Sequence, residues 1–121
     1  MADSQGTNDV WPSELDALHA APEHHELLME NDRVRVLRTS IPAGGTTALH
    51  THRWPAAYLI ERWSPFVRRD ADGQVTLDSR TVQGLERPAG PIWSPPLPPH
   101  TLENVGDDEI LLVSVEIKTT V

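Results

Sequence analysis

Residues 111–118 read Leu-Leu-Val-Ser-Val-Glu-Ile-Lys, and this stretch says most about the fold. Large aliphatic residues occupy every second position from Leu111 to Ile117, which is the side-chain period of a β-strand. A turn at Gly106-Asp107-Asp108 precedes the stretch. The end of the chain is therefore predicted to be a strand that is entered from a tight turn.

The same period of two recurs upstream, between clusters of turn-forming residues. Val34 and Val36 share one face of residues 33–38, and Arg33 and Arg35 share the other, which indicates a half-buried strand. Asp72-Gly73 is typical of a two-residue hairpin turn. Further segments with strand character are residues 26–30, 48–52, 56–63, 66–69 and 75–77. About nine short strands at intervals of about ten residues predict an all-β fold, an antiparallel sandwich or a small barrel.

The N-terminal part has a different pattern and predicts one short helix. Ser13 is the expected N-cap, acidic residues follow in the first turn, and Pro22 prevents continuation. We therefore divide the chain into an N-terminal extension with a short helix, residues 1–23, and a β-domain, residues 24–121.

Composition excludes several classes of function. The chain has 121 residues, enough for one domain, and a formal net charge of −8, so it lacks the basic surface that nucleic acids and anionic membranes attract. It has no cysteine, which excludes disulfides and thiolate metal ligands. Residues 1–10 are polar and acidic, unlike a signal peptide, so we expect a cytoplasmic protein.

His50-Thr51-His52 is the first candidate site. On a strand, alternate residues face the same side, so both imidazoles could converge on one cation. Surface histidines, or core histidines that only form hydrogen bonds, are the alternative reading of a bare pair. His19, His24 and His25 have no partner motif, and we expect them to be exposed or to be ordinary strand residues outside any site.

Two groups of residues resemble the two motifs of the cupin family, which belongs to the RmlC-like superfamily. The two groups follow the order and the spacing of those motifs. The first group is Gly44, His50 and His52, and the second is Pro95, His100 and Asn104. The resemblance covers about residues 26–118 and implies a cupin-type antiparallel β-barrel or jelly roll. Asn104 is expected to tie a turn through its side-chain amide.

The sequence departs from the family pattern where the acidic metal ligand should lie, because that place is taken by Ala56 or Ala57. The resemblance therefore implies a site of three histidines, His50, His52 and His100, for a divalent metal ion such as iron, zinc, nickel or manganese. Such a site leaves coordination positions open. The family includes dioxygenases, some of them with three-histidine sites, and isomerases. The alternative is a metal-free module that binds a small molecule without transforming it.

The expected partners are a small-molecule ligand and a second copy of the chain. Tyr58, Trp63 and Trp93 are the candidate substrate-binding residues, since cupin barrels line their mouths with aromatic side chains. A homodimer is expected by analogy with small cupins. The apolar residues around Val10, Trp11 and Leu15 could pack on the neighbour.

Overall fold

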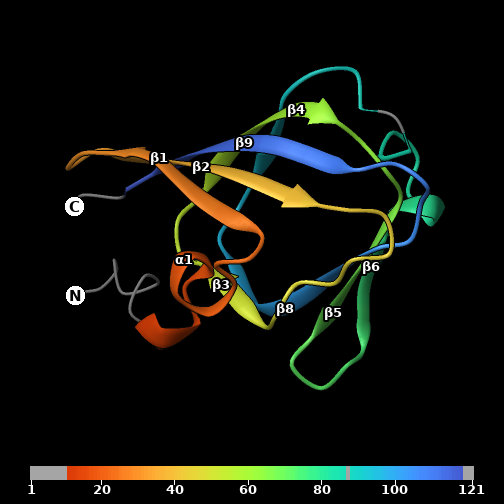
Figure 1. The fold of residues 1–121 in the computed structure, drawn as a ribbon, viewed down its shortest axis with the longest axis horizontal. Coiled ribbons are helices and arrows are strands. Elements are labelled where there is room, and N and C mark those ends of the chain that lie inside the picture. The colour runs from red at the N-terminus through yellow and green to blue at the C-terminus, as the bar shows by residue number, and fades with distance from the viewer. Residues whose placement is uncertain (1–10, 87, 119–121) are drawn as a thin grey trace.

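The computed structural model describes residues 11–86 and 88–118, which fold into two antiparallel sheets that face each other (Figure 1). One sheet has five strands in the order β1-β2-β9-β4-β7, and the other has four in the order β3-β8-β5-β6. The strands are β1 His25–Glu30, β2 Val34–Ile41, β3 His50–His52, β4 Ala56–Arg62, β5 Phe66–Asp70, β6 Val75–Asp78, β7 Ile92–Ser94, β8 Leu97–Asn104 and β9 Ile110–Ile117. The predicted all-β jelly roll is confirmed, although the described strands form two sheets and not one closed barrel.

Two short helical turns precede the sheets, a 3-10 turn η2, Ser13–Leu15, and the helix α1, Ala17–Ala20. The expected N-cap at Ser13 is wrong: the Asp16 carboxylate accepts a hydrogen bond from the Leu18 amide, 3.2 Å. Asp16 has an extended backbone that separates the two turns, so the cap lies between them. A third turn, η3, Ser79–Thr81, follows β6, and no helix of the described residues is long and apolar enough to cross a membrane.

Strand β2 is half-buried as predicted, but its valines are not on the buried face. The buried side chains are Arg35, Leu37, Thr39 and Ile41, whereas Val34 and Val36 are only partly covered. Burying an arginine requires an acidic partner, and that partner lies on another strand, where the β2 pattern alone could not show it.

Strand β9 repeats this arrangement at the centre of the five-stranded sheet. Its buried side chains include Ser114 and Glu116, whereas Val113 and Val115 are half-buried and Ile117 is exposed. The pairing places Arg35 opposite Glu116. The inward face of the sheet is therefore rich in polar groups at the end where the histidines lie.

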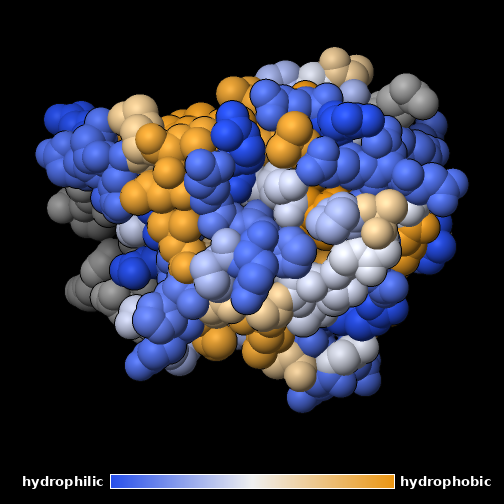
Figure 2. All heavy atoms as spheres, in the orientation of Figure 1, coloured by the Kyte–Doolittle hydropathy of each residue, from blue (hydrophilic) through white to orange (hydrophobic). Residues whose placement is uncertain are grey.

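A bulge in β1 changes the face that its side chains occupy. Met29 pairs with Val36 and Leu27 pairs with Leu37, so Leu28 is an extra residue in the edge strand. Beyond the bulge, His25 pairs with Thr39 on the inward face. Leu28 and its neighbours stay exposed, and Figure 2 shows apolar surface gathered over β1.

The opposite end of the sandwich holds the apolar core. Ile41, Phe66 and Ile110 are buried there. Asn104 closes this end as predicted, because its side-chain amide donates to the carbonyl oxygens of Ile41 and Asp108 at 3.0 and 2.8 Å. The expected hairpin at Gly73 is present, with a φ of 85° that suits glycine, but its loop is longer than the predicted two residues, because the Asp70 amide donates to the Gln74 carbonyl.

Candidate metal centre

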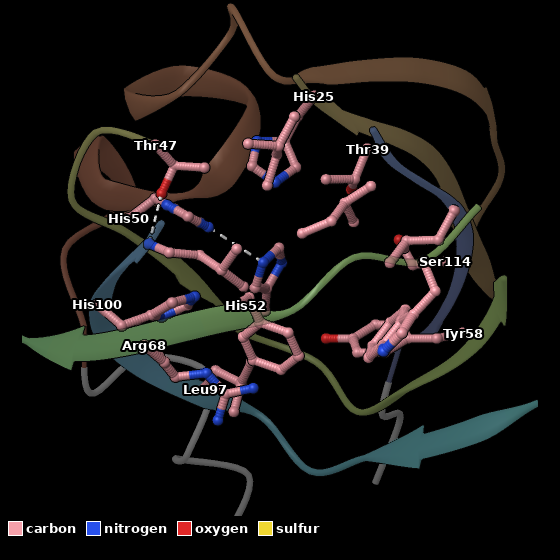
Figure 3. Close-up of a pocket in the computed structure, with 16 residues that line it drawn as sticks. His25, Thr39, Thr47, His50, His52, Tyr58, Arg68, Leu97, His100 and Ser114 are labelled. Atoms are coloured by element: carbon pink, nitrogen blue, oxygen red, sulfur yellow. Dashed lines mark hydrogen bonds between the residues drawn. The ribbon is translucent and has the colours of Figure 1, made fainter. Parts of the chain in front are cut away.

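Four histidine rings meet between the sheets: His50 and His52 from β3, His100 from β8 and His25 from β1 (Figure 3). The centroid of the His50 ring lies 4.9 Å from that of His52, 4.4 Å from that of His100 and 4.8 Å from that of His25. All four residues are buried. Strand pairing sets the contact between His50 and His100, which are direct partners in the register.

The ligand atoms that come closest together are those of His25, His50 and His52, all within 4.8 Å of one another. The sequence did not reveal His25, which was expected to be exposed or to be an ordinary strand residue outside any site. His100 adjoins this group through its ring contacts with His50 and His52, at 4.4 and 5.5 Å between centroids. The residues expected to hold the metal thus lie together, and His25 joins them.

Backbone carbonyls orient three of the rings. The Nδ1 of His50 contacts the oxygen of Ala48 at 2.7 Å, that of His100 contacts Pro98 at 2.7 Å, and that of His25 contacts Ala21 at 3.0 Å. A carbonyl oxygen only accepts, so each of these Nδ1 atoms carries the proton and donates it. Each Nε2 therefore keeps a free lone pair, which is how metal-binding histidines are oriented in other proteins.

The protonation states also suit metal binding. Burial lowers the pKa of His50, His52 and His25, and it lowers the pKa of His100 to about 4. The imidazoles are thus neutral near pH 7, and a metal would not have to displace a second proton from each ring.

The ring of His52 faces a carboxylate instead of a carbonyl. Its Nε2 lies 3.2 Å from the Nε2 of His50, and its Nδ1 lies 3.5 Å from Glu116 Oε2. That Oε2 atom is buried and has no hydrogen-bond partner among the described residues. Metal binding would require the proton of His52 on Nδ1, toward Glu116, so that the lone pairs of both Nε2 atoms face the short gap between them.

That gap fits a metal ion. Two imidazole nitrogens bound to zinc at about 2.0–2.1 Å in tetrahedral geometry lie about 3.3 Å apart. The observed 3.2 Å is close to this separation, and the unpaired Glu116 oxygen would accept the His52 proton. The side chains present therefore fit a divalent ion that favours nitrogen ligands.

An ion network supports Glu116 from the other side. Arg35 donates from Nε to Glu116 Oε1 at 2.6 Å and from both terminal nitrogens to Asp16 at 2.9 Å. Burial alone would raise the pKa of Asp16, but the hydrogen bonds and charge of Arg35 lower it. Burial raises the pKa of Glu116, and Arg35 opposes that shift. None of these three residues was recognised from the sequence, because their contacts join strands far apart in the chain.

The cavity beside the histidines has a volume of about 70 Å³. Two of the expected substrate-binding residues, Tyr58 and Trp63, line it. Trp93 does not: it is 61% exposed, because Ser94 is the β7 residue that is buried and Trp93 points the other way along the strand. The Tyr58 side chain enters the cavity from β4 (Figure 3), and burial raises the pKa of its hydroxyl, so it stays a proton donor.

This arrangement, a two-sheet jelly roll with inward histidines on paired strands, defines the class of double-stranded β-helix proteins. No protein-family model and no curated protein matches the sequence. Solved structures do match. A cupin domain from Bordetella pertussis is 25% identical with a TM-score of 0.61, over 78% of this chain and 92% of that one.

Two other matches show the fold alone. An RmlC-like cupin from Methanocaldococcus jannaschii is 14% identical with a TM-score of 0.53, over 77% of each chain. A protein with a double-stranded β-helix domain from Klebsiella pneumoniae is 18% identical with a TM-score of 0.52, over 97% of this chain and 90% of that one. The chain therefore has the fold of small cupin domains, to which these solved structures are similar.

Proposed function

We propose that this cupin domain binds one divalent metal ion through imidazoles alone and holds a small molecule in the adjoining cavity. The carrying observation is the approach of the His50 and His52 Nε2 atoms to 3.2 Å, with the proton of His50 held on the opposite ring nitrogen. His25 supplies the third nitrogen of the compact group, and His100 is the candidate for a fourth.

A bound divalent ion would supply Lewis acidity and, in the case of iron, the ability to activate dioxygen. Those are the chemistries of an isomerase or of a dioxygenase, the two reaction types that the resemblance implies. The chain's own contribution is to keep the imidazoles neutral and fixed, to exclude bulk water and to offer the Tyr58 hydroxyl as a hydrogen-bond donor at the cavity.

Metal titration of the chelator-stripped protein tests the proposal, with iron(II), zinc, nickel and manganese each added under anaerobic conditions. We expect calorimetry to find one ion per chain and thermal unfolding to shift upward, because a ligand at about a hundred times its Kd stabilises the native state by about 2.7 kcal/mol. Uptake of none of the four metals would defeat the metal claim.

Single alanine variants then assign the ligands. His50→Ala and His52→Ala should each weaken binding by about a hundredfold or more, since losses of supporting residues alone cost about 10–100-fold. His25→Ala should also weaken binding, whereas the control His24→Ala should not, because the His24 ring contacts the Ser40 carbonyl outside the cluster. If His100→Ala weakens binding and His25→Ala does not, the three ligands are the ones expected from the sequence.

The second candidate is the metal-free binding module, and the absence of a carboxylate from the ligand set favours it. Its signature would be stabilisation by an organic molecule that persists unchanged in the presence of a chelator, in a protein that takes up no metal.

A further inference from the structure

Arg68 is the cavity residue that the metal proposal leaves unexplained. It lies on β5, lines the cavity, and its Nε atom is buried without a hydrogen-bond partner. Figure 3 shows its side chain beside His100 and Leu97. A guanidinium whose Nε is buried without a hydrogen-bond partner is costly, so this position calls for an explanation.

The other buried or half-buried arginines of the described residues have partners. Arg35 is held by Asp16 and Glu116, and Arg69, the neighbour of Arg68, pairs with Glu103 at 2.8 Å. Arg53 also has a buried, unpaired Nε, but its guanidinium lies over the Trp54 ring at 4.7 Å. Within residues 11–86 and 88–118, Arg68 has neither an ion pair nor an aromatic ring beneath it.

The charges around the cavity favour an anion. The side chains of His50, His52 and His100 line the same cavity and carry no negative charge, so they cannot compensate Arg68. Glu116 is engaged by Arg35. A metal ion at the histidines would add two positive charges without any carboxylate ligand to offset them.

We propose that the cavity takes a small carboxylate whose acid group is bound by Arg68 and whose other end reaches the histidine cluster. This inference rests on the proposed function, since it names the ligand class of the same cavity. An arginine suits the acid because its planar fork matches the two carboxylate oxygens. At about 10–15 Å³ for each enclosed water, 70 Å³ admits a ligand of about five to seven non-hydrogen atoms.

The hydroxyl of Tyr58 supports the same choice of ligand. Tyr58 lines the same cavity as Arg68, and its hydroxyl is near enough to the guanidinium to interact with it electrostatically. A neutral phenol next to a guanidinium provides a second donor and no competing negative charge. The two residues therefore offer a pair of donors to one acid group.

Calorimetric titration with L-lactate tests the proposal, and L-lactamide, which has the same number of non-hydrogen atoms but no charge, is the matched probe. The titrations use the full chain, both stripped with chelator and loaded with metal. We expect lactate to bind in both forms. Lactamide should bind at least about tenfold more weakly, because losing a hydrogen bond between charged groups lowers affinity by about tenfold or more.

Substitutions at two adjacent arginines locate the effect. Arg68→Met should weaken lactate binding by about tenfold to a hundredfold, and Arg68→Lys should restore part of it. Arg69→Met, which removes a charge that pairs with Glu103, should leave it unchanged. Circular dichroism and the thermal midpoint of each variant report whether it is folded.

Two results would overturn the proposal: equal binding of lactate and lactamide, or equal lactate binding by the wild type and a folded Arg68→Met variant. Failure of the metal proposal has a different signature, since a chain that takes up no metal would still bind lactate through Arg68 in the stripped form. Metal uptake by Arg68→Met at the wild-type level would show that the substitution affects carboxylate binding and not the metal site.

Discussion

The two faces of the five-stranded sheet distribute their side chains in opposite ways. On the outward face, a row of apolar residues in register crosses all five strands: Met29, Val36, Val115, Ala57 and Trp93. On the inward face, the neighbouring row contains Arg35 and Glu116, which are almost fully buried. The comparison shows that a strand's apolar face need not be its buried face when the interior holds a polar site.

The largest expected effect comes from the inward ion network. Arg35→Met leaves Asp16 and Glu116 buried without their counter-ion, so we expect the free energy of unfolding to fall by about 3–5 kcal/mol. Denaturation in urea, monitored by tryptophan fluorescence, measures this change.

Arg38→Met is the matched control, because Arg38 lies on the same strand but on the outward face. Its ion pair with Glu26 is exposed, with 3.5 Å between the charged atoms. Such pairs contribute about 0–1 kcal/mol. Equal losses for the two substitutions would contradict the contrast between the faces.

The pH dependence should also come from the inward face. The pKa of His100 is lowered from 6.5 to about 4 in the folded, metal-free protein. Between those values the unfolded chain binds a proton that the folded chain does not, so stability falls as the pH decreases from about 6.5 to 4. For His100 alone the loss is about 3 kcal/mol. In the presence of chelator, the free energy of unfolding, measured by urea denaturation at each pH, should fall less for His100→Gln than for the wild type over this range. The same dependence on pH in both proteins would contradict the prediction.

The smallest effect on folding is expected on the outward face, where the row of apolar residues would be covered in the homodimer expected from the sequence. Met29 is 49% exposed, so Met29→Lys should change the free energy of unfolding by about 0.5 kcal/mol or less. It should nevertheless separate a dimer into chains of 13.4 kDa, as measured by light scattering.

Val75→Lys, an equivalent substitution of an exposed apolar residue on β6 of the other sheet, should leave the dimer intact. A wild-type protein that scatters as a monomer would contradict the homodimer. Of the N-terminal residues first considered for this contact, Val10 lies outside the described residues, and Trp11 and Leu15 are half-buried.

The sequence predicted the parts of this molecule that depend on local spacing. Alternation identified β2 and β9, and the spacing of His50 and His52 placed both on one strand. It could not predict which face of β2 is buried, because that depends on Glu116, which lies 81 residues away from Arg35. The sequence also wrongly predicted that Trp93 lies at the cavity, because the identity of an aromatic residue on a strand does not show which face of the sheet it occupies.

His25 was missed because it has no partner motif in the sequence, and the strand period alone would not have placed it at the site. Counting in steps of two from Met29, which faces outward beside Val36, also places His25 on the outward face. The extra residue at Leu28 reverses that parity. A bulge in an edge strand has no reliable signature in a single sequence, so the third member of the compact histidine group could be found only from the structure.

The bulge in β1 has a consequence for how sites of this kind can diverge. Because β1 pairs on one side only, gaining or losing one residue there alters no other strand pairing. A deletion of the single codon for Glu26 would place His25 opposite Arg38, on the outward face, and leave His50, His52 and His100 in place. Descendants of one ancestral scaffold could thus exchange ligand sets of different size in a single mutational event, without rebuilding their interior.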